Sequence, residues 1–226
     1  MMNQRASQRT SRLFSSCVVA CLLTCLTAAV QAAPQAPSRC PRCVECADEA
    51  AGLRTVRVKV YNRSPMDPAS LTALLDVTNR IWLPYDVRIE PVTGLDAIAV
   101  VVSEGQRPSG SADVRAVLGE TLFTRHHATP YIRLWLGAAE ATADTTPIEG
   151  VPFRALKRDE REAILRRMLG VALAHELAHY LLDTEKHSRR GLLREALTIR
   201  DLQHPELRRL ELSGAQQWLM CSTAGR

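Results

Sequence analysis

Residues 175–194 read HELAHYLLDTEKHSRRGLLR, and their first five letters form the pattern His-Glu-x-x-His. His175 and His179 are four residues apart, so on a helix both imidazoles lie on the same face, one turn apart. Two neutral imidazoles that converge in this way are preferred ligands of zinc. Glu176 follows the first histidine, where its carboxylate would take a proton from a water molecule activated by the metal. The stretch therefore predicts a site for one Zn2+ ion, with Glu176 as the catalytic base.

The helix that carries this pattern is predicted over residues 159–182. Asp159 and Glu162 form a start that resembles a capping box, and apolar residues then recur at helical spacing. The second half of the helix is apolar except for the two histidines and the glutamate. Polar groups in a buried stretch need partners, and a metal ion would supply one.

A catalytic zinc site needs a third protein ligand, which is expected from the segment after the helix. His187 is the predicted third ligand, because imidazole is a common zinc donor and the intervening residues can turn the chain back under the helix. Glu185 is the alternative, since it stands where metzincin peptidases carry their third ligand. Those enzymes use a glycine for the turn, whereas this chain has Leu182. Glu195 and His204 are more distant candidates.

The same stretch resembles a group of exported bacterial zincin-type proteins. Their pattern is His-Glu-x-x-His, a histidine eight places further on, and then Gly-Leu-Met-Arg. The residues that match this pattern are His175, Glu176, His179, His187, Gly191, Leu192 and Arg194. Leu193 stands where the group has methionine, and this exchange changes the side-chain volume little. The resemblance implies a metzincin-like turn beneath the metal, a zincin-like α+β fold and metallopeptidase activity.

The first half of the domain has the pattern of a small sheet. Strands are predicted over residues 55–61, 87–92, 97–102 and 131–136. A helix is predicted from Ser70 to about Trp82, whereas residues 138–154 are polar, contain proline and are predicted to form a surface loop. Two short C-terminal segments begin at plausible caps, Thr198 and Ser213. The fold class predicted from these elements is α+β, with a small mixed sheet and a short C-terminal helical part.

The order of these elements resembles a zincin half-domain, in which an edge strand lines the substrate cleft. The resemblance implies that residues 131–136 form this edge strand. A peptide laid along it could pair through backbone hydrogen bonds and present a carbonyl to the metal. A peptide or protein is therefore the favoured substrate. The alternative is a catalytically inactive zincin-like interaction protein, which would have no need of the base Glu176.

The first 32 residues are predicted to be a secretory signal peptide. Arg5, Arg9 and Arg12 precede the uncharged residues 13–30, and a Val-Gln-Ala ending suggests cleavage after Ala32. An uncleaved anchor and a lipoprotein are the alternatives, because the uncharged stretch is nearly long enough to span a bilayer. The mature protein is expected outside the cytoplasm, in the periplasm or the medium, and free of the membrane.

The cysteines fall into two groups. Three lie inside the predicted signal peptide, and the mature chain keeps Cys40, Cys43, Cys46 and Cys221. Residues 33–51 form a leader rich in cysteine and proline, and residues 52–226 are predicted to be a single zincin-like catalytic domain. In an oxidising compartment, four cysteines favour two disulfides. A metal knuckle in the leader is the alternative, but it lacks a nearby fourth ligand.

The charge of the chain indicates little about partners. The net charge is +5, and the predicted signal peptide holds three arginines and no acidic residue, so the mature part carries +2. Basic residues occur as short pairs mixed with acids, whereas nucleic-acid binders usually show a dense stripe. A nucleic-acid partner is therefore not expected, and the sequence does not indicate an oligomeric state.

Overall fold

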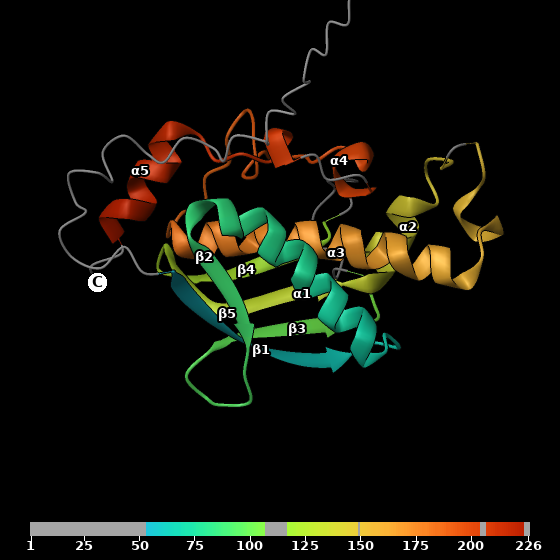
Figure 1. The fold of residues 1–226 in the computed structure, drawn as a ribbon, viewed down its shortest axis with the longest axis horizontal. Helices are drawn as coiled ribbons and strands as arrows, with labels where there is room; N and C mark the ends of the chain where they lie inside the picture. The colour runs from blue at the N-terminus through green and yellow to red at the C-terminus, as the bar shows by residue number, and fades with distance from the viewer. Residues whose placement is uncertain (1–52, 107–116, 149, 204–206, 224–226) are drawn as a thin grey trace, which may run out of the picture. The chain divides into compact units, whose positions relative to one another are not determined.

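The strands of this protein form a five-stranded mixed sheet in the order β2-β1-β3-β5-β4. The computed structural model describes residues 53–106, 117–148, 150–203 and 207–223 (Figure 1). The strands are β1 (Arg54–Arg63), β2 (Val87–Pro91), β3 (Ile98–Ser103), β4 (Gly119–Thr124) and β5 (His127–Trp135). Strands β2, β1, β3 and β5 are parallel, whereas β4 lies at the edge and is antiparallel to β5.

The helices of the described residues are α1 (Pro68–Trp82), α2 (Leu136–Ala143), α3 (Arg158–Leu181), α4 (Ile199–Gln203) and α5 (Gly214–Thr223). Short 3-10 turns form η1 (Leu83–Tyr85), η2 (Phe153–Ala155) and η3 (Leu207–Arg209). Helices α1 and α3 pack against the sheet and cross each other (Figure 1). At the crossing, a Cβ atom on Gly170 would lie 2.6 Å from the Val77 Cβ, so the close approach requires glycine.

The hydrophobic core lies between the sheet and these two helices. Val58, Val100 and Leu134, one from each of the three central strands, all have an exposed fraction of 0%. Leu173 and Leu177 of α3 are buried to the same extent. Burial stabilises each such side chain by roughly 1.5–3 kcal/mol. This burial fixes the position of the second half of α3, and with it the positions of the polar residues in that half.

This arrangement confirms the predicted α+β class with a mixed sheet. The strands predicted over residues 55–61, 87–92 and 97–102 correspond to β1, β2 and β3. The helix predicted from Ser70 begins two residues earlier, at Pro68, because the Asp67 carboxylate caps it and accepts the Ser70 N–H at 2.9 Å. The helical spacing of the apolar residues predicted the helix correctly, whereas its first residue is determined by the cap.

The short C-terminal helical part is present, with both predicted caps. The Thr198 hydroxyl oxygen accepts the backbone N–H of Asp201 at 3.2 Å, at the start of α4. The Ser213 hydroxyl oxygen accepts the N–H of Gln216 at 3.4 Å, at the start of α5. Such side-chain oxygens satisfy N–H groups that a first helical turn leaves unpaired.

The edge of the sheet differs from the prediction. Residues 131–136, predicted as the edge strand, lie almost entirely within β5, which pairs with β3 on one side and β4 on the other. The edge is β4, which the sequence analysis missed. This strand has only six residues, and Gly119, Glu120 and Thr121 conceal its hydrophobic alternation.

The surface loop predicted over residues 138–154 is also wrong in part. Its first residues belong to α2, and its last to η2. The sequence of α2 is LGAAEATA, and alanine is the strongest helix former. Ala138, Ala139 and Ala143 are buried, so this short helix is stabilised by packing that its small side chains permit.

The start of α3 needs a smaller correction. The helix begins at Arg158, one residue before the predicted start. Glu162 does not take part in the capping interaction at this end of the helix. The carboxylate of Glu160 accepts the backbone N–H of Lys157 at 2.9 Å instead. Glu162 pairs with Arg158 one turn away, at 2.7 Å.

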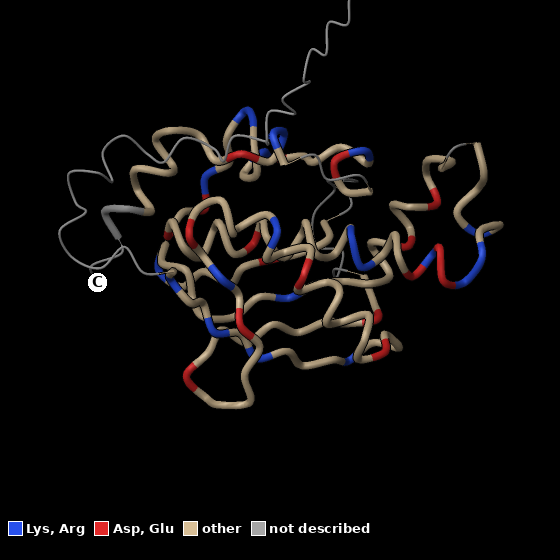
Figure 2. The backbone as a smooth tube through the Cα atoms, viewed as in Figure 1, with Lys and Arg blue, Asp and Glu red and all other residues tan. Residues whose placement is uncertain are grey.

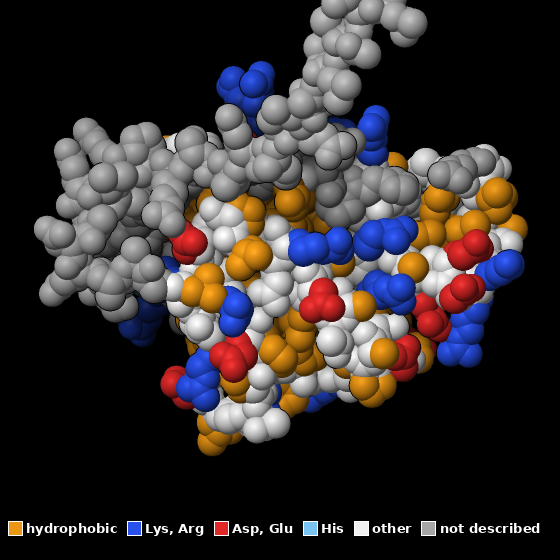
Figure 3. Space-filling view, in the orientation of Figure 1, with side chains coloured by type: hydrophobic (Ala, Val, Ile, Leu, Met, Phe, Trp, Pro, Cys, Tyr) orange, Lys and Arg blue, Asp and Glu red, His pale blue; other side chains and the backbone are white. Residues whose placement is uncertain are grey.

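Several predictions fall outside the described residues, including the signal peptide, the leader and Cys40, Cys43 and Cys46. Cys221 lies in α5, but its side chain is not described. Within the described part of the chain, no helix is both long and apolar enough to cross a membrane. Figure 2 shows basic and acidic residues interspersed along the backbone, and Figure 3 shows both kinds mixed with apolar side chains on one face. The absence of a nucleic-acid partner stays a prediction.

Candidate metal centre

Three histidine side chains meet beside the C-terminal half of α3. One ring nitrogen from each of His175, His179 and His187 lies within 4.8 Å of the others. The Nε2 atoms of His175 and His179 are 3.1 Å apart. Two nitrogens bound to one tetrahedral zinc ion, each at about 2.05 Å, would lie about 3.3 Å apart. The spacing of these two rings therefore fits a single zinc ion.

Backbone carbonyl groups set the orientation of both helix histidines. The Nδ1 atom of His175 lies 2.6 Å from the Leu192 oxygen, and that of His179 lies 2.6 Å from the Thr184 oxygen. A carbonyl oxygen only accepts hydrogen bonds, so each Nδ1 carries a proton and donates it. In the neutral ring, Nε2 then has a free lone pair. Two such lone pairs facing each other at 3.1 Å repel unless a cation lies between them.

The surroundings favour the neutral form of these rings. Burial lowers the pKa of His175 to about 4, and the neighbouring His179 adds to the effect. Burial also lowers the pKa of His179, although its hydrogen bond to Thr184 opposes this. Near pH 7 both imidazoles are therefore uncharged, which is the state that binds a metal ion.

The structure brings His187, the predicted third ligand, into this cluster. Its ring centroid lies 5.5 Å from that of His175 and 4.8 Å from that of His179. Glu185, the alternative, lines the same cavity but lies outside the cluster. One of its carboxylate oxygens is 3.6 Å from Nδ1 of His126. Of the distant candidates, Glu195 lines the cavity, and His204 lies outside the described residues.

Glu176, the predicted base, faces the edge strand β4. Its exposed fraction is 7%. The Thr121 hydroxyl lies 2.9 Å from its Oε2 atom and 2.8 Å from its backbone oxygen, and can donate to either. A Cβ atom on Gly119 would lie 2.8 Å from the Glu176 Cγ. Strand β4 therefore passes directly over this carboxylate, at a point where a larger residue would displace it.

Gly119 and Thr121 are the site residues that sequence reasoning missed. Their contacts with Glu176 join residues more than fifty positions apart, which no local pattern indicates. The available signal was the run Thr-Leu-Phe-Thr, whose residue types favour strands. It identifies a strand, but not its partner.

The segment Gly191 to Arg194 forms the turn that holds His175. The backbone N–H of Arg194 donates to the Gly191 oxygen at 3.2 Å, and Leu192 and Leu193 are buried. Gly191 has a φ of +78°, and a Cβ atom there would lie 2.0 Å from the Glu211 carbonyl oxygen. Only glycine satisfies both conditions. These contacts help to hold the Leu192 carbonyl where it accepts the His175 Nδ1–H.

The cluster opens into a cavity of about 570 Å³. Strand β4 and the residues before it line one wall, and the three histidines and Glu176 line another. Apolar side chains close the remainder, among them Leu118, Ala172, Leu197 and Leu202. A mostly apolar concave surface with a few convergent polar groups is typical of a small-molecule or peptide site.

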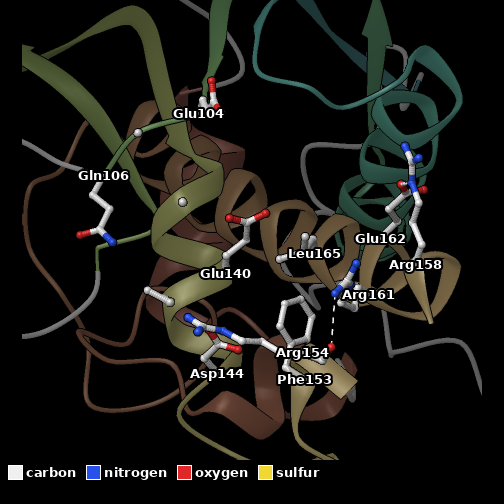
Figure 4. Close-up of a pocket in the computed structure, with 13 residues that line it drawn as sticks. Glu104, Gln106, Glu140, Asp144, Phe153, Arg154, Arg158, Arg161, Glu162 and Leu165 are labelled. Atoms are coloured by element: carbon white, nitrogen blue, oxygen red, sulfur yellow. Dashed lines mark hydrogen bonds and ion pairs between the residues drawn. The ribbon is translucent and has the colours of Figure 1, made fainter. Parts of the chain in front are cut away.

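A larger cleft, of about 900 Å³, lies between α2 and the first turns of α3 (Figure 4). Its charged residues are largely paired with each other, as Arg154 is with Asp144 at 2.7 Å. Arg161 donates to the Arg154 carbonyl oxygen at 3.4 Å, which Figure 4 marks with a dashed line. The described residues that line this cleft include no histidine or cysteine. The cluster of three histidines lies in the smaller cavity.

Comparison with known proteins adds little to this geometry. No protein family profile matches the sequence, and no curated protein matches it. Among solved structures, the chain is similar to the crystal structure of archaemetzincin from Methanopyrus kandleri, with a TM-score of 0.49 and 10% identity. The match covers 79% of this chain and 99% of that chain. A likeness of this size establishes neither a fold nor an activity.

Proposed function

We propose that this protein is a zinc-dependent metallopeptidase. The observation that carries the proposal is the convergence of three imidazoles beside a buried carboxylate in one cavity. Two of these rings present unprotonated Nε2 atoms to each other, held by carbonyl groups behind them. This donor set matches the three protein ligands of a catalytic zinc site, with one position left for water or substrate.

His175, His179 and His187 would hold the ion. When bound, zinc supplies Lewis acidity, which polarises a carbonyl oxygen and lowers the pKa of a water molecule at the open position. Glu176 would accept the proton from that water and pass it to the departing amine. Its burial under β4 limits its movement, and the Thr121 hydroxyl can orient its Oε2 atom.

A peptide is the substrate class that the edge strand supports. In the described residues, β4 pairs with β5 on one side and forms the edge of the sheet on the other. Residues of β4 also line the cavity that contains the histidine cluster. An extended peptide could add to this edge through backbone hydrogen bonds, with its side chains alternating into and out of the cavity. The scissile carbonyl would then lie near Glu176.

Export of the mature protein and two disulfides among its four cysteines are part of the proposal. Support for both comes from the sequence. Export is supported by the uncharged segment before Ala32, which follows three arginines, and the disulfides are supported by the even number of cysteines after Ala32. Mass spectrometry of the protein, purified after secretion by the cells that produce it, would identify the first residue of the mature chain. Titration with a thiol reagent would find no free thiol if both disulfides form.

The direct test compares the mature protein with its Glu176→Gln variant. Both are expected to contain one zinc ion per chain by elemental analysis, whereas peptide cleavage by the variant falls at least about 100-fold. Glu140→Gln, in the larger cleft, is the matched control and should cleave normally. Wild-type protein without stoichiometric zinc would refute the proposal.

The second candidate is an inactive interaction protein that keeps the metal site for structure. The intact Glu176 and its fitted contact with Gly119 favour the enzyme, because a purely structural site does not need a base. If the variant and the wild type bind zinc equally and neither cleaves any member of a peptide library, the interaction protein becomes the better description.

A further inference from the structure

Asp201 is a buried carboxylate behind the metal centre that the proposed reaction does not use. It lies in α4 and has an exposed fraction of 1%. An ionised carboxylate is costly to bury unless it is paired and hydrogen bonded. Its partners come from three separate segments of the chain: the turn at residues 191–194, the start of α4 and η3.

One carboxylate oxygen of Asp201 accepts several hydrogen bonds, and the other makes an ion pair but no hydrogen bond. Its Oδ2 atom accepts the backbone N–H of Thr198 at 3.0 Å and the Thr198 hydroxyl at 2.5 Å. The same oxygen accepts a hydrogen bond from Nη2 of Arg194. Nε of Arg209 lies 3.0 Å from the other oxygen, Oδ1. Burial alone would raise the pKa of Asp201, but the Thr198 hydrogen bonds and the Arg194 charge lower it, so the carboxylate stays ionised.

One of these partners leads directly to the metal centre. Arg194 is the last residue of the turn whose Leu192 carbonyl accepts the His175 Nδ1–H at 2.6 Å. On its other side, the same turn packs at Gly191 against the Glu211 carbonyl. Between these contacts the turn is held by the Ser188 N–H, which donates to the Leu193 oxygen at 2.8 Å, and by the burial of Leu192 and Leu193. The Asp201 to Arg194 ion pair anchors the last residue of the turn from the side of α4, and so adds a further constraint on where the Leu192 oxygen lies.

His179 has no such dependence. Its acceptor, the Thr184 carbonyl, belongs to the turn that ends α3, and the Thr184 N–H donates back to the His179 carbonyl at 3.1 Å. The acceptor of His179 is thus fixed by its own helix end. The acceptor of His175 lies in a turn that is held both by its own backbone hydrogen bonds and by the ion pair of Arg194 with Asp201.

We propose that Asp201 is a positioning residue for the metal centre, which holds the Leu192 carbonyl in place through Arg194 and so orients the His175 ring. This inference rests on the proposed zinc site. It predicts an asymmetry: loss of the Asp201 charge disturbs His175 and leaves His179 as it was. A residue that merely stabilises the fold would affect both histidines or neither.

The test uses the mature protein, with histidine labelled by nitrogen-15, and its Asp201→Asn variant. In the zinc-free proteins, the Nδ1–H proton signals of His175 and His179 are followed by NMR. The His175 signal should shift or be lost to exchange in the variant, while the His179 signal is unchanged. Zinc affinity, measured by competition with a chromophoric chelator, should fall about tenfold, as expected when a supporting partner of a ligand is removed.

The control is Asp144→Asn, which removes a carboxylate from another Asp–Arg pair, in the larger cleft. It should change neither signal and leave zinc affinity within twofold. If Asp201→Asn fails to fold, Arg194→Gln serves in its place, because it breaks the link but keeps the contacts of Asp201 with Thr198 and Arg209.

Two results would overturn the inference. One is an unchanged His175 signal together with unchanged zinc affinity in the folded variant. The other is an equal disturbance of both histidine signals. Failure of the wild type to bind zinc would instead refute the proposed function, so the two failures are distinguishable.

Discussion

Replacing Gly119 by alanine tests whether β4 positions Glu176, the proposed catalytic base. The added Cβ atom would lie 2.8 Å from the Glu176 Cγ and 3.1 Å from its Oε1. It would also lie 3.1 Å from Cδ2 of Leu134 in the core, so neither side offers free space. Either the Glu176 side chain moves or β4 moves away from α3.

The size of the effect follows from this crowding. Overpacking by one methyl group in a closed site costs about 1–3 kcal/mol of unfolding free energy. For a domain of this size that lowers the melting temperature by roughly 2–10 °C. A displacement of the carboxylate approaching 1 Å would lower kcat about 100-fold. The three atoms nearest to the added Cβ belong to Glu176 and Leu134 and to none of the three histidines, so zinc content should stay at one ion per chain.

The assay measures kcat on a cleaved peptide, zinc by elemental analysis and melting by circular dichroism. Gly214→Ala is the matched control, because a Cβ atom there has no neighbour within 4 Å. It should leave kcat and zinc content unchanged and should not lower the melting temperature, because alanine favours a helix more than glycine does. The reasoning is refuted if Gly119→Ala keeps its zinc and cleaves the peptide within twofold of the wild-type rate.

Three further predictions concern the supports of the site. Gly191→Ala combines a positive φ with a Cβ atom 2.0 Å from the Glu211 carbonyl oxygen. It should destabilise the fold by more than about 3 kcal/mol in urea unfolding, and a loss below about 1 kcal/mol would contradict the packing. Thr121→Val removes the hydroxyl near Glu176. Unfolding free energy should fall by about 1–2 kcal/mol with zinc retained, and an unchanged value would show that the hydrogen bond is unimportant. The third prediction concerns the zinc-free protein, in which the pKa of His175 is about 4 in the folded state and 6.5 in the unfolded state. As the pH falls, the unfolded chain therefore takes up a proton on this residue before the folded chain does. Stability is therefore lost between pH 6.5 and 4, by about 2 kcal/mol from pH 7 to pH 5. His175→Gln should lack this contribution, and equal pH dependence of the two proteins would refute it.

The parts of the site that the sequence predicted are those set by local geometry. The spacing of His175 and His179 follows from the helical repeat, and the apolar run around them indicated that this part of the helix is buried. The placement of His187 required only a short turn after the helix. In each case, residues near each other in sequence are also near each other in space.

The parts that were missed depend on contacts between distant segments. Strand β4 is short and weakly patterned, so its edge position was assigned to β5 instead. The fit of Gly119 against Glu176 exists only once β4 lies over α3. The ion pair of Arg194 with Asp201 joins two residues whose types are common on surfaces, and nothing in their spacing distinguishes a buried pair from an exposed one.

These distant contacts explain why the whole domain, and not the helix alone, is needed to form the candidate metal centre. An isolated helix with the same sequence would keep the spacing of His175 and His179, but its rings would titrate near pH 6.5 and exchange between two tautomers. In the folded chain, burial lowers the pKa of His175 to about 4. The Leu192 and Thr184 carbonyls select the tautomer that leaves Nε2 free on each ring. Burial in the core thus keeps the candidate ligands uncharged, and the segment after α3 orients their rings. Binding of a metal ion requires both conditions.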